Sequence, residues 1–274
     1  MPGRRGHPAF RAIRPVPGGP QRASYSSRKM DAAGMSDRDS CNALADRFRS
    51  FSSRDRLDED LAADVARILR SALEQRGKAS LVLSGGSTPK GFFGTLAKED
   101  LDWSRVTVTL ADDRWVRADH RDSNDRLVRE NLLQGAAGDA QFVSLVTQDE
   151  HPRDAVSEIS KRLADLGTID VMILGMGGDG HFASLFPGAE NLSAGLDLSS
   201  SDTVIAVDPI TAPHARMSMT LARILDSRHL IVHIVGEEKR AVLERARLEK
   251  DAATLPIAAV LASEAPAATV YWAP

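Results

Sequence analysis

The stretch DVMILGMGGDGHFASLFP, residues 170–187, decides how this chain folds. Its first five residues form an apolar run of strand length that glycine ends abruptly, and this pattern predicts a buried strand. Four glycines then let the backbone approach a ligand closely, namely Gly175, Gly177, Gly178 and Gly180. Open α/β sheets bind their ligands at such turns, at the carboxyl ends of strands. The stretch therefore predicts an open α/β sheet with a ligand site here.

Asp179 and His181 are the ionisable side chains of this turn, and an imidazole can transfer protons near neutral pH. Two other readings are open. Gly175, Gly177 and Gly180 spell G-x-G-x-x-G, but a dinucleotide site needs a full crossover helix, and HFASLF allows only about two turns before Pro187. In the second reading, His181 only forms hydrogen bonds that stabilise the turn and binds no ligand. The glycines around His181 favour a ligand site.

Composition places the chain among soluble α/β proteins. It has 274 residues, 42% of them apolar, enough for a sizeable core. No apolar run reaches 18 residues, so we expect no membrane partner. The single cysteine, Cys41, excludes an internal disulfide and cysteine-rich zinc patterns. These features fit a reducing compartment, and we predict a cytoplasmic protein.

Charge is unevenly distributed. Residues 1–30 contain seven basic residues and no acid. Removing them from the 35 basic residues leaves 28 against 38 acidic ones, a net charge of −10 for residues 31–274. An acidic body does not attract nucleic acid, so we expect no such partner. An anionic substrate must be captured by local donors.

Residues 1–40 are predicted to form a disordered, basic N-terminal tail, because a segment rich in Pro, Gly, Arg and Ser buries little apolar surface. A start at Met30 or Met35 and a cleaved targeting peptide are alternatives. Residues 41–274 are expected to form a single α/β domain.

Periodicity predicts alternating strands and helices in this domain. The strand candidates are 80–86, 106–114, 142–145, 170–175, 203–209, 217–221, 229–236 and 268–272. The helix candidates are 57–77, 88–99, a segment starting near residues 123–124, 153–165 and 237–249. Such alternation predicts a three-layer αβα fold, with a mostly parallel, Rossmann-like open sheet and helices on both faces.

The segment SGGSTPKG, residues 84–91, lies between a predicted strand and helix. Gly85 and Gly86 free backbone amides, and Ser87 and Thr88 add hydroxyl donors, as in a phosphate-binding turn. The G-K-S/T ending of a P-loop is absent, so no nucleoside triphosphate is implied. A tight turn capped by Ser87 is the alternative.

The segment ADDRWV, residues 111–116, ends the second predicted strand with Asp112, Asp113 and Arg114. Arg114 could bind a phosphate or carboxylate, or stabilise charge that develops on an oxygen. A solvated loop with a local ion pair is the alternative. The tripeptide DSN, residues 122–124, predicts a helix start capped by Asp122 or Ser123.

Two cations occur later in the chain. Arg216 lies beside a predicted strand, and Lys239 lies in the first turn of a predicted helix. A cation at a helix N-terminus opposes the helix dipole, which hints at a ligand anion nearby. A solvated lysine is the alternative.

Together, SGGSTP, DDRWV with DSN, GMGGDGH with ASLFP, ARMS and GEEK resemble, in order and approximate spacing, the 6-phosphogluconolactonases. The resemblance covers about residues 45–273. That family shares the histidine turn with glucosamine-6-phosphate deaminases, which usually continue differently after the histidine. Two positions depart from the family pattern: Asp113 replaces a glutamate, and Phe182, which could narrow the pocket, replaces a threonine.

The resemblance implies hydrolysis of 6-phospho-D-glucono-1,5-lactone to 6-phospho-D-gluconate in the oxidative pentose phosphate pathway. His181 would be the general base, Asp179 would orient it, and Arg114 would bind the phosphate or the oxyanion. Opening an ester needs an activated water and a stabilised oxyanion, so we expect no metal and no cofactor. The expected substrate-binding residues are Gly85, Gly86, Ser87, Thr88, Asp112, Asp113, Asn124, Gly177, Gly178, Gly180, Arg216 and Lys239.

Two other functions compete with this interpretation. A glucosamine-6-phosphate deaminase or isomerase would use the same histidine turn, although the ASLFP ending favours a lactonase. The other is a sugar-phosphate sensor without turnover. The sequence argues against a sensor because it keeps His181, Asp179 and Arg114. The expected partner is a small sugar phosphate, and the expected assembly is a monomer or weak homodimer.

Overall fold

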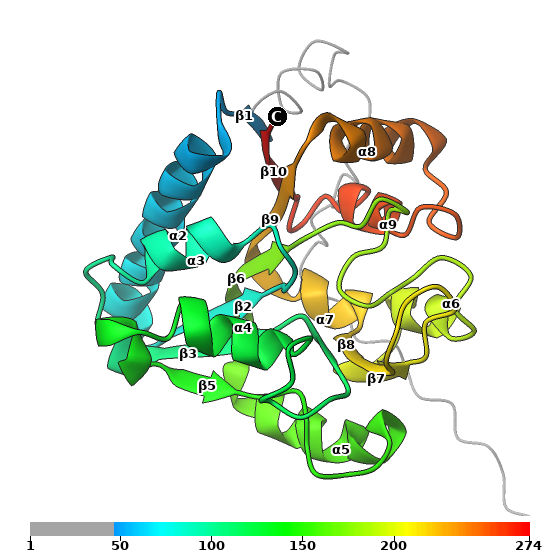
Figure 1. The fold of residues 1–274 in the computed structure, drawn as a ribbon, viewed down its shortest axis with the longest axis horizontal. Coiled ribbons are helices and arrows are strands. Elements are labelled where there is room, and N and C mark those ends of the chain that lie inside the picture. Colours follow the sequence, from blue (N-terminus) through cyan, green and yellow to red (C-terminus); the bar gives the residue numbers. More distant parts are fainter. Residues whose placement is uncertain (1–46) are drawn as a thin grey trace, which may run out of the picture.

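The computed structural model describes residues 47–274 (Figure 1). The predicted tail, residues 1–40, and Cys41 lie outside the described residues. Within the described part, no helix combines the length and apolar character needed to cross a membrane. That residues 41–274 form one domain stays a prediction.

The main sheet has seven strands in the order β1-β10-β9-β6-β2-β3-β5, and every neighbouring pair is parallel. This confirms the mostly parallel α/β fold. Its strands are β1 (Phe48–Ser50), β2 (Ala79–Leu83), β3 (Val106–Leu110), β5 (Gln141–Val143), β6 (Ile169–Leu174), β9 (Ser227–Val235) and β10 (Thr269–Ala273).

The two central strands explain why the sequence favours a covered sheet. All five residues of β2 and all six of β6 are buried. Strands buried on both faces read as continuous apolar runs rather than alternating ones. After β2 the chain builds towards β3 and β5, whereas after β6 it builds towards β9 and β10. The order therefore reverses between β2 and β6, where open sheets place their ligands.

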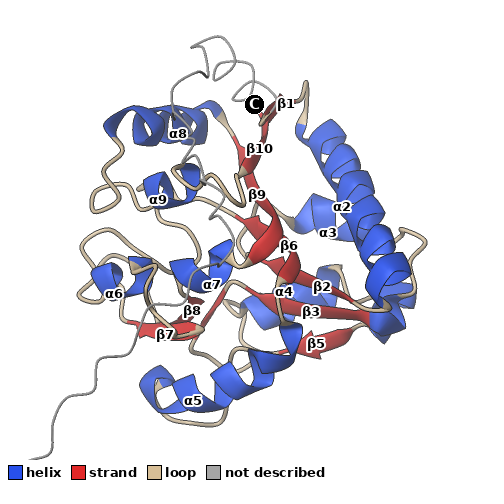
Figure 2. Cartoon of the chain, turned by 180° about the vertical axis from the view of Figure 1, so that it is seen from behind, coloured by secondary structure: helices blue, strands red, loops and turns tan. Residues whose placement is uncertain are grey.

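Helices cover both faces of this sheet (Figures 1 and 2). Helices α2 and α3 lie together on one side, and α7 and α8 lie on the other, where both contact β9. The helices are α2 (Arg54–Arg76), α3 (Lys90–Leu96), α4 (Asn124–Asn131), α5 (Pro152–Leu163), α6 (Leu192–Leu196), α7 (Leu221–Leu225), α8 (Glu237–Glu249) and α9 (Ile257–Leu261). Ser53 caps α2, and Gly77 ends it in the left-handed conformation that glycine favours.

A second, antiparallel sheet with the order β4-β8-β7 was not predicted as a separate unit. It consists of β4 (Asp112–Arg114), β7 (Val204–Val207) and β8 (Arg216–Met219). The prediction of one strand over 106–114 is wrong, because the chain leaves the main sheet at Ala111. The amide of Ala111 donates to Leu83 of the main sheet, whereas its carbonyl accepts from Met219 of the small one. One short segment thus joins the two sheets.

The segment after His181 also differs from the prediction. HFASLF forms no helix; Phe182 and Leu185 make an isolated bridge instead. Phe182 is fully buried in the core and does not line the pocket described below, so the idea that it narrows the pocket is wrong. A buried phenylalanine here anchors the turn.

Candidate functional site

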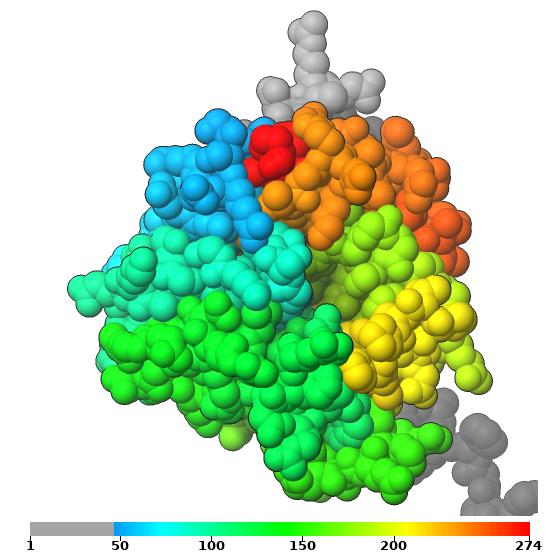
Figure 3. Space-filling model, viewed as in Figure 1, coloured from blue at the N-terminus to red at the C-terminus, as the bar shows by residue number. Residues whose placement is uncertain are grey.

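A cavity of about 340 Å³ opens where β2, β6 and β9 end. It is the hollow in the middle of the face drawn in Figure 3, between the cyan, green, yellow and orange parts of the chain. Its position at the reversal of strand order agrees with the prediction from residues 170–187.

Most of the predicted site residues meet in this cavity. Those that line it are Gly85, Gly86, Ser87, Thr88, Asp112, Arg114, Asn124, Gly177, His181, Arg216 and Lys239. Those that do not are Asp113, Gly178, Asp179 and Gly180. The lining residues that the sequence analysis missed include Ser84, Met176, Ala183, Phe186, Ala212 and His233.

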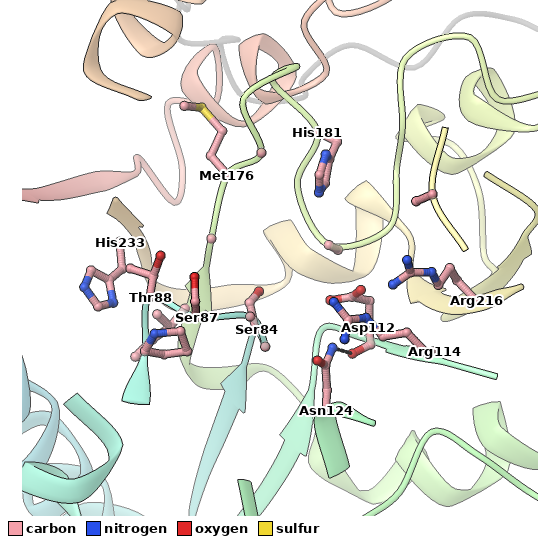
Figure 4. Close-up of a pocket in the computed structure, with 18 of the residues that line it drawn as sticks. Ser84, Ser87, Thr88, Asp112, Arg114, Asn124, Met176, His181, Arg216 and His233 are labelled. Carbon is pink, nitrogen blue, oxygen red and sulfur yellow. Dashed lines mark hydrogen bonds between the residues drawn. The ribbon is translucent and has the colours of Figure 1, made fainter. Parts of the chain in front are cut away.

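His181 stands in the histidine turn, the name we give to residues 175–181. Its Nδ1 lies 2.5 Å from Oδ1 of Asp179, and its ring packs on Phe186 at 4.1 Å between centroids. Burial raises the pKa of Asp179, but the hydrogen bonds and charge of His181 outweigh it, so the pKa is lowered overall. Asp179 therefore orients the ring from behind rather than lining the cavity. Nε2 has no hydrogen-bond partner among residues 47–274, and Figure 4 shows the ring pointing into the pocket.

Two glycines make this turn possible. A Cβ on Gly177 would lie 2.2 Å from the His181 ring, so only glycine leaves room for the ring where it is. Gly180 has a φ of +78°, and a Cβ there would also meet Leu255 at 2.8 Å. Gly178 faces open space. Of these glycines, which were predicted to bind substrate, Gly177 borders the cavity, whereas Gly180 shapes the turn.

The serine turn, residues 84–88, follows β2 and lines one end of the cavity. Arg54 of α2 donates to the carbonyls of Ser87 and Thr88 at 2.8 and 2.7 Å, so it supports the turn from outside. The alternative reading of Ser87 as a helix cap is wrong, because Pro89 is the N-cap residue of α3 and no side chain caps this helix there. The hydroxyl of Ser84 is buried, has no hydrogen-bond partner in the described part of the chain, and borders the cavity.

The opposite end of the cavity is formed by β4 and β8, here called the arginine strands (Figure 4). Arg114 and Arg216 are cross-strand partners in their register. Arg114 donates to the carbonyl of Asp122 at 2.6 Å, and Arg216 donates to those of Pro213 and His214 at 3.0 and 3.3 Å. Neither forms an ion pair with a carboxylate among the described residues. The alternative of a local ion pair at Arg114 is therefore wrong.

Two like charges directly opposite each other destabilise a strand pair. Arg216 is only 5% exposed, and burial together with the charge of Arg114 lowers its pKa. Nε of Arg114 is buried and has no hydrogen-bond partner within residues 47–274. The arginine strands therefore present a site for an anion.

The two neighbouring aspartates have different environments because strand residues alternate in direction. Asp112 faces the cavity, and its Oδ2 accepts from Ser184 at 2.6 Å. Asp113 is fully buried on the other face and accepts from the amides of Arg114, Asn124 and Asp125 at 2.7, 2.7 and 3.0 Å. Burial raises the pKa of Asp113 to about 7. Asp113 does not line the cavity, unlike most of the predicted site residues; it holds β4 against the start of α4, and its contact with substrate stays a prediction.

Asn124 and Lys239 complete the cavity wall. Nδ2 of Asn124 donates to the carbonyl of Asp112 at 2.9 Å, while its Oδ1 has no hydrogen-bond partner among the described residues and lies 1.9 Å from where a Cβ of Gly85 would be. The helix start at this point is confirmed, with Ser123 as the cap. Lys239 lies in the first turn of α8, and burial lowers its pKa. It makes no ion pair within residues 47–274.

Among the described residues, one group of side chains could hold a metal ion. His120, Asp122 and His214 each place one ligand atom within 4.8 Å of the others. All three are half-buried, and none lines the cavity. Nδ1 of His120 already accepts from the amide of Asp122 at 3.1 Å. That the function needs no metal stays a prediction.

Comparisons with known proteins agree with this geometry. Residues 52–272 match the family described as glucosamine-6-phosphate isomerases/6-phosphogluconolactonase. A 6-phosphogluconolactonase of Rhizobium meliloti (strain 1021) is 44% identical over 225 residues, which cover 82% of this chain and 97% of that protein. One from Pseudomonas putida is 44% identical over 214 residues, which cover 78% and 87%.

Among solved structures, a 6-phosphogluconolactonase from Shewanella baltica OS155 has a TM-score of 0.81 to this structure. The two chains are 41% identical, and the match covers 83% of this chain and 97% of that one. The similarity therefore extends over nearly all of the described residues.

Proposed function

This chain belongs to the family of glucosamine-6-phosphate isomerases and 6-phosphogluconolactonases, and we propose that it hydrolyses 6-phospho-D-glucono-1,5-lactone to 6-phospho-D-gluconate. This is the second step of the oxidative pentose phosphate pathway. The similarity to named lactonases at 44% identity supports the reaction class. The expected cytoplasmic location and monomeric or weakly dimeric state stay predictions.

One observation carries the proposal: an oriented imidazole with a free nitrogen shares a cavity with three cations that lack carboxylate partners among residues 47–274. The cations are Arg114, Arg216 and Lys239. A lactone that carries a phosphate has a carbonyl to attack and an anion to bind, so it matches both parts.

The proposed mechanism begins at Nε2 of His181. This nitrogen takes a proton from a water molecule as the water oxygen attacks the carbonyl carbon of the lactone. Asp179 accepts the hydrogen bond from Nδ1–H and so stabilises the imidazolium that forms. The carbon–ring oxygen bond then breaks, and the proton on Nε2 passes to the ring oxygen as it leaves. The product is an open-chain carboxylic acid, which ionises in water.

The arginine strands are assigned to the charge that develops on the carbonyl oxygen. Arg114 and Arg216 are held by backbone carbonyls, so their guanidinium groups are oriented before the reaction begins. The substrate phosphate is assigned to the serine turn and Lys239 at the other end of the cavity. This arrangement leaves the ester between the two ends, below His181.

The proposal is tested by following proton release from freshly prepared 6-phosphogluconolactone against its spontaneous hydrolysis. We expect saturable acceleration by the full chain and none by heat-denatured protein. Glucosamine 6-phosphate is tested in parallel for ammonia release, which would reveal a deaminase. A wild-type protein that binds 6-phosphogluconate but leaves the lactone rate at its spontaneous value would refute the proposal and indicate a sensor.

A further inference from the structure

The wall of the cavity contains a buried histidine that the mechanism above does not use. His233 lies in β9, is 2% exposed, and borders the cavity. Figure 4 shows it at the same end as Ser87 and Thr88, away from Arg114 and Arg216. Phe92 packs edge-on against its ring, with centroids 6.1 Å apart.

Both ring nitrogens of His233 lack a hydrogen-bond partner among the described residues. Nε2 is buried, and the nearest carboxylate oxygen, Oδ1 of Asp58, is 3.8 Å away, too far for a hydrogen bond. Nδ1 is not among the fully buried atoms without a partner, and His233 lines the cavity, so Nδ1 is the ring nitrogen available to a ligand. An unpartnered polar group in a closed site costs free energy, and a ligand that supplies the partner recovers it.

The charges around His233 indicate which ligand that is. Burial, with the positive charges of Arg54 and Lys239, lowers the pKa of His233 to about 3, so the ring is neutral at physiological pH. Asp58 lies behind the ring, and burial raises its pKa to about 6. A neutral ring beside an unpaired lysine and hydroxyl-bearing residues suits an anion that carries several acceptor oxygens, which is a phosphate group.

We propose that His233 is a further substrate-binding residue, whose Nδ1 hydrogen-bonds an oxygen of the substrate phosphate at the serine-turn end of the cavity. This inference rests on the proposed function for its substrate, but the phosphate contact itself does not depend on turnover. Asp58 and Arg54 act behind it: Arg54 holds the carbonyls of the serine turn, and Asp58 occupies the space beside Gly91 that a Cβ would fill.

The kinetic test compares His233→Leu with His233→Asn, whose side-chain amide can replace Nδ1. We expect His233→Leu to raise KM for the phosphorylated lactone about tenfold to a hundredfold, the value of a hydrogen bond to a charged group, with kcat changed much less. His233→Asn should recover much of the loss. His229→Leu, the same change at the exposed other end of β9, is the matched control and should behave as wild type.

Two competing inhibitors, inorganic phosphate and D-gluconate, distinguish a phosphate contact from a sugar contact. In His233→Leu the inhibition constant of phosphate should rise by the same factor as KM, while that of gluconate stays unchanged. Equal weakening of both, or no weakening of phosphate, would overturn the inference. Circular dichroism and thermal unfolding establish that the variants are folded.

A measurement on the wild-type chain needs no variant and no turnover. The ring nitrogen and proton signals of His233 are followed by NMR while inorganic phosphate is added. We expect a saturable shift of the Nδ1 signal, with the ring neutral before and after. A His233 signal that stays constant while other cavity signals move would refute the contact. A wild type that shows this shift but opens no lactone would refute the proposed function alone.

Discussion

The two ends of the cavity bind charge in different ways. The serine turn and the histidine turn use glycine, backbone groups and hydroxyls at the ends of buried parallel strands. The arginine strands use two long charged side chains on a small antiparallel sheet. Added side-chain atoms should disrupt the first arrangement, whereas loss of a positive charge should disrupt the second. Substitutions should therefore affect the two ends by different mechanisms.

The largest effect is expected at the histidine turn. His181→Ala should lower kcat about 10²–10⁴-fold, because the variant lacks the group that accepts the proton from water. KM should change little, since the phosphate contacts lie elsewhere. Initial rates, corrected for spontaneous hydrolysis, measure this, with His229→Ala as the control. A rate of lactone opening equal to that of wild type would remove His181 from the mechanism.

At the arginine strands, Arg114→Ala should lower kcat about 10²–10³-fold, the usual cost of losing one donor to an oxyanion. Steady-state kinetics decide between the two roles that the sequence left open. A rise in KM with kcat unchanged would mean that Arg114 binds the phosphate and that our assignment of the two ends is reversed. Arg56→Ala, an exposed arginine of α2, is the control and should match wild type.

A pair of glycine substitutions tests whether an added side-chain atom displaces the His181 ring. Gly177→Ala should lower kcat about 10- to 100-fold, because the new Cβ would lie 2.2 Å from the His181 ring and displace it. Gly178→Ala adds the same methyl group where nothing lies within 4 Å and should leave kcat unchanged. Both variants should unfold at similar temperatures. Equal kinetics for the two would show that the ring position is not restricted as the structure indicates.

The smallest effect concerns stability and pH. The pKa of His233 is lowered to about 3, so below about pH 6.5 the unfolded chain binds a proton that the folded chain does not. Stability should therefore fall as pH decreases from about 6.5 towards 3. Arg54 and Lys239 oppose protonation of this ring, while Asp58, with its pKa raised to about 6, takes up a proton in the folded state and works in the other direction.

His233→Leu removes the histidine contribution, about 1 kcal/mol one pH unit below the unfolded pKa. Urea unfolding at about pH 7.5 and 5.5 measures it. The variant should lose less stability than wild type over this interval. A loss equal to that of wild type would mean that the ring becomes charged in the folded protein.

Much of the fold could be predicted because local patterns determine it. The continuous apolar runs of β2 and β6 and the periodicity of α2 and α8 indicate their elements directly. The small sheet could not be found this way. Its strand β4 has three residues and pairs with β8 about a hundred residues later, so no local pattern signals the pairing.

The lining of the cavity could be predicted where glycine and charge cluster in short motifs, but not where strand direction decides which residues face it. Alternation along β4 turns Asp113 away from the cavity that Asp112 and Arg114 face, a result that follows from recognising 112–114 as a separate strand. The sequence does carry a signal for His233: an imidazole in the middle of the apolar run LIVHIV, residues 230–235, is costly to bury unless something pairs with it.

The facing pair of Arg114 and Arg216 has a consequence for the end of the catalytic cycle. In the proposed mechanism, ring opening converts an uncharged ester group into a carboxylate beside the two guanidinium groups. Arg114 and Arg216 would then bind the newly formed carboxylate while the serine-turn end of the cavity holds the phosphate. We therefore expect the hydrolysed sugar acid to inhibit the reaction competitively as it accumulates.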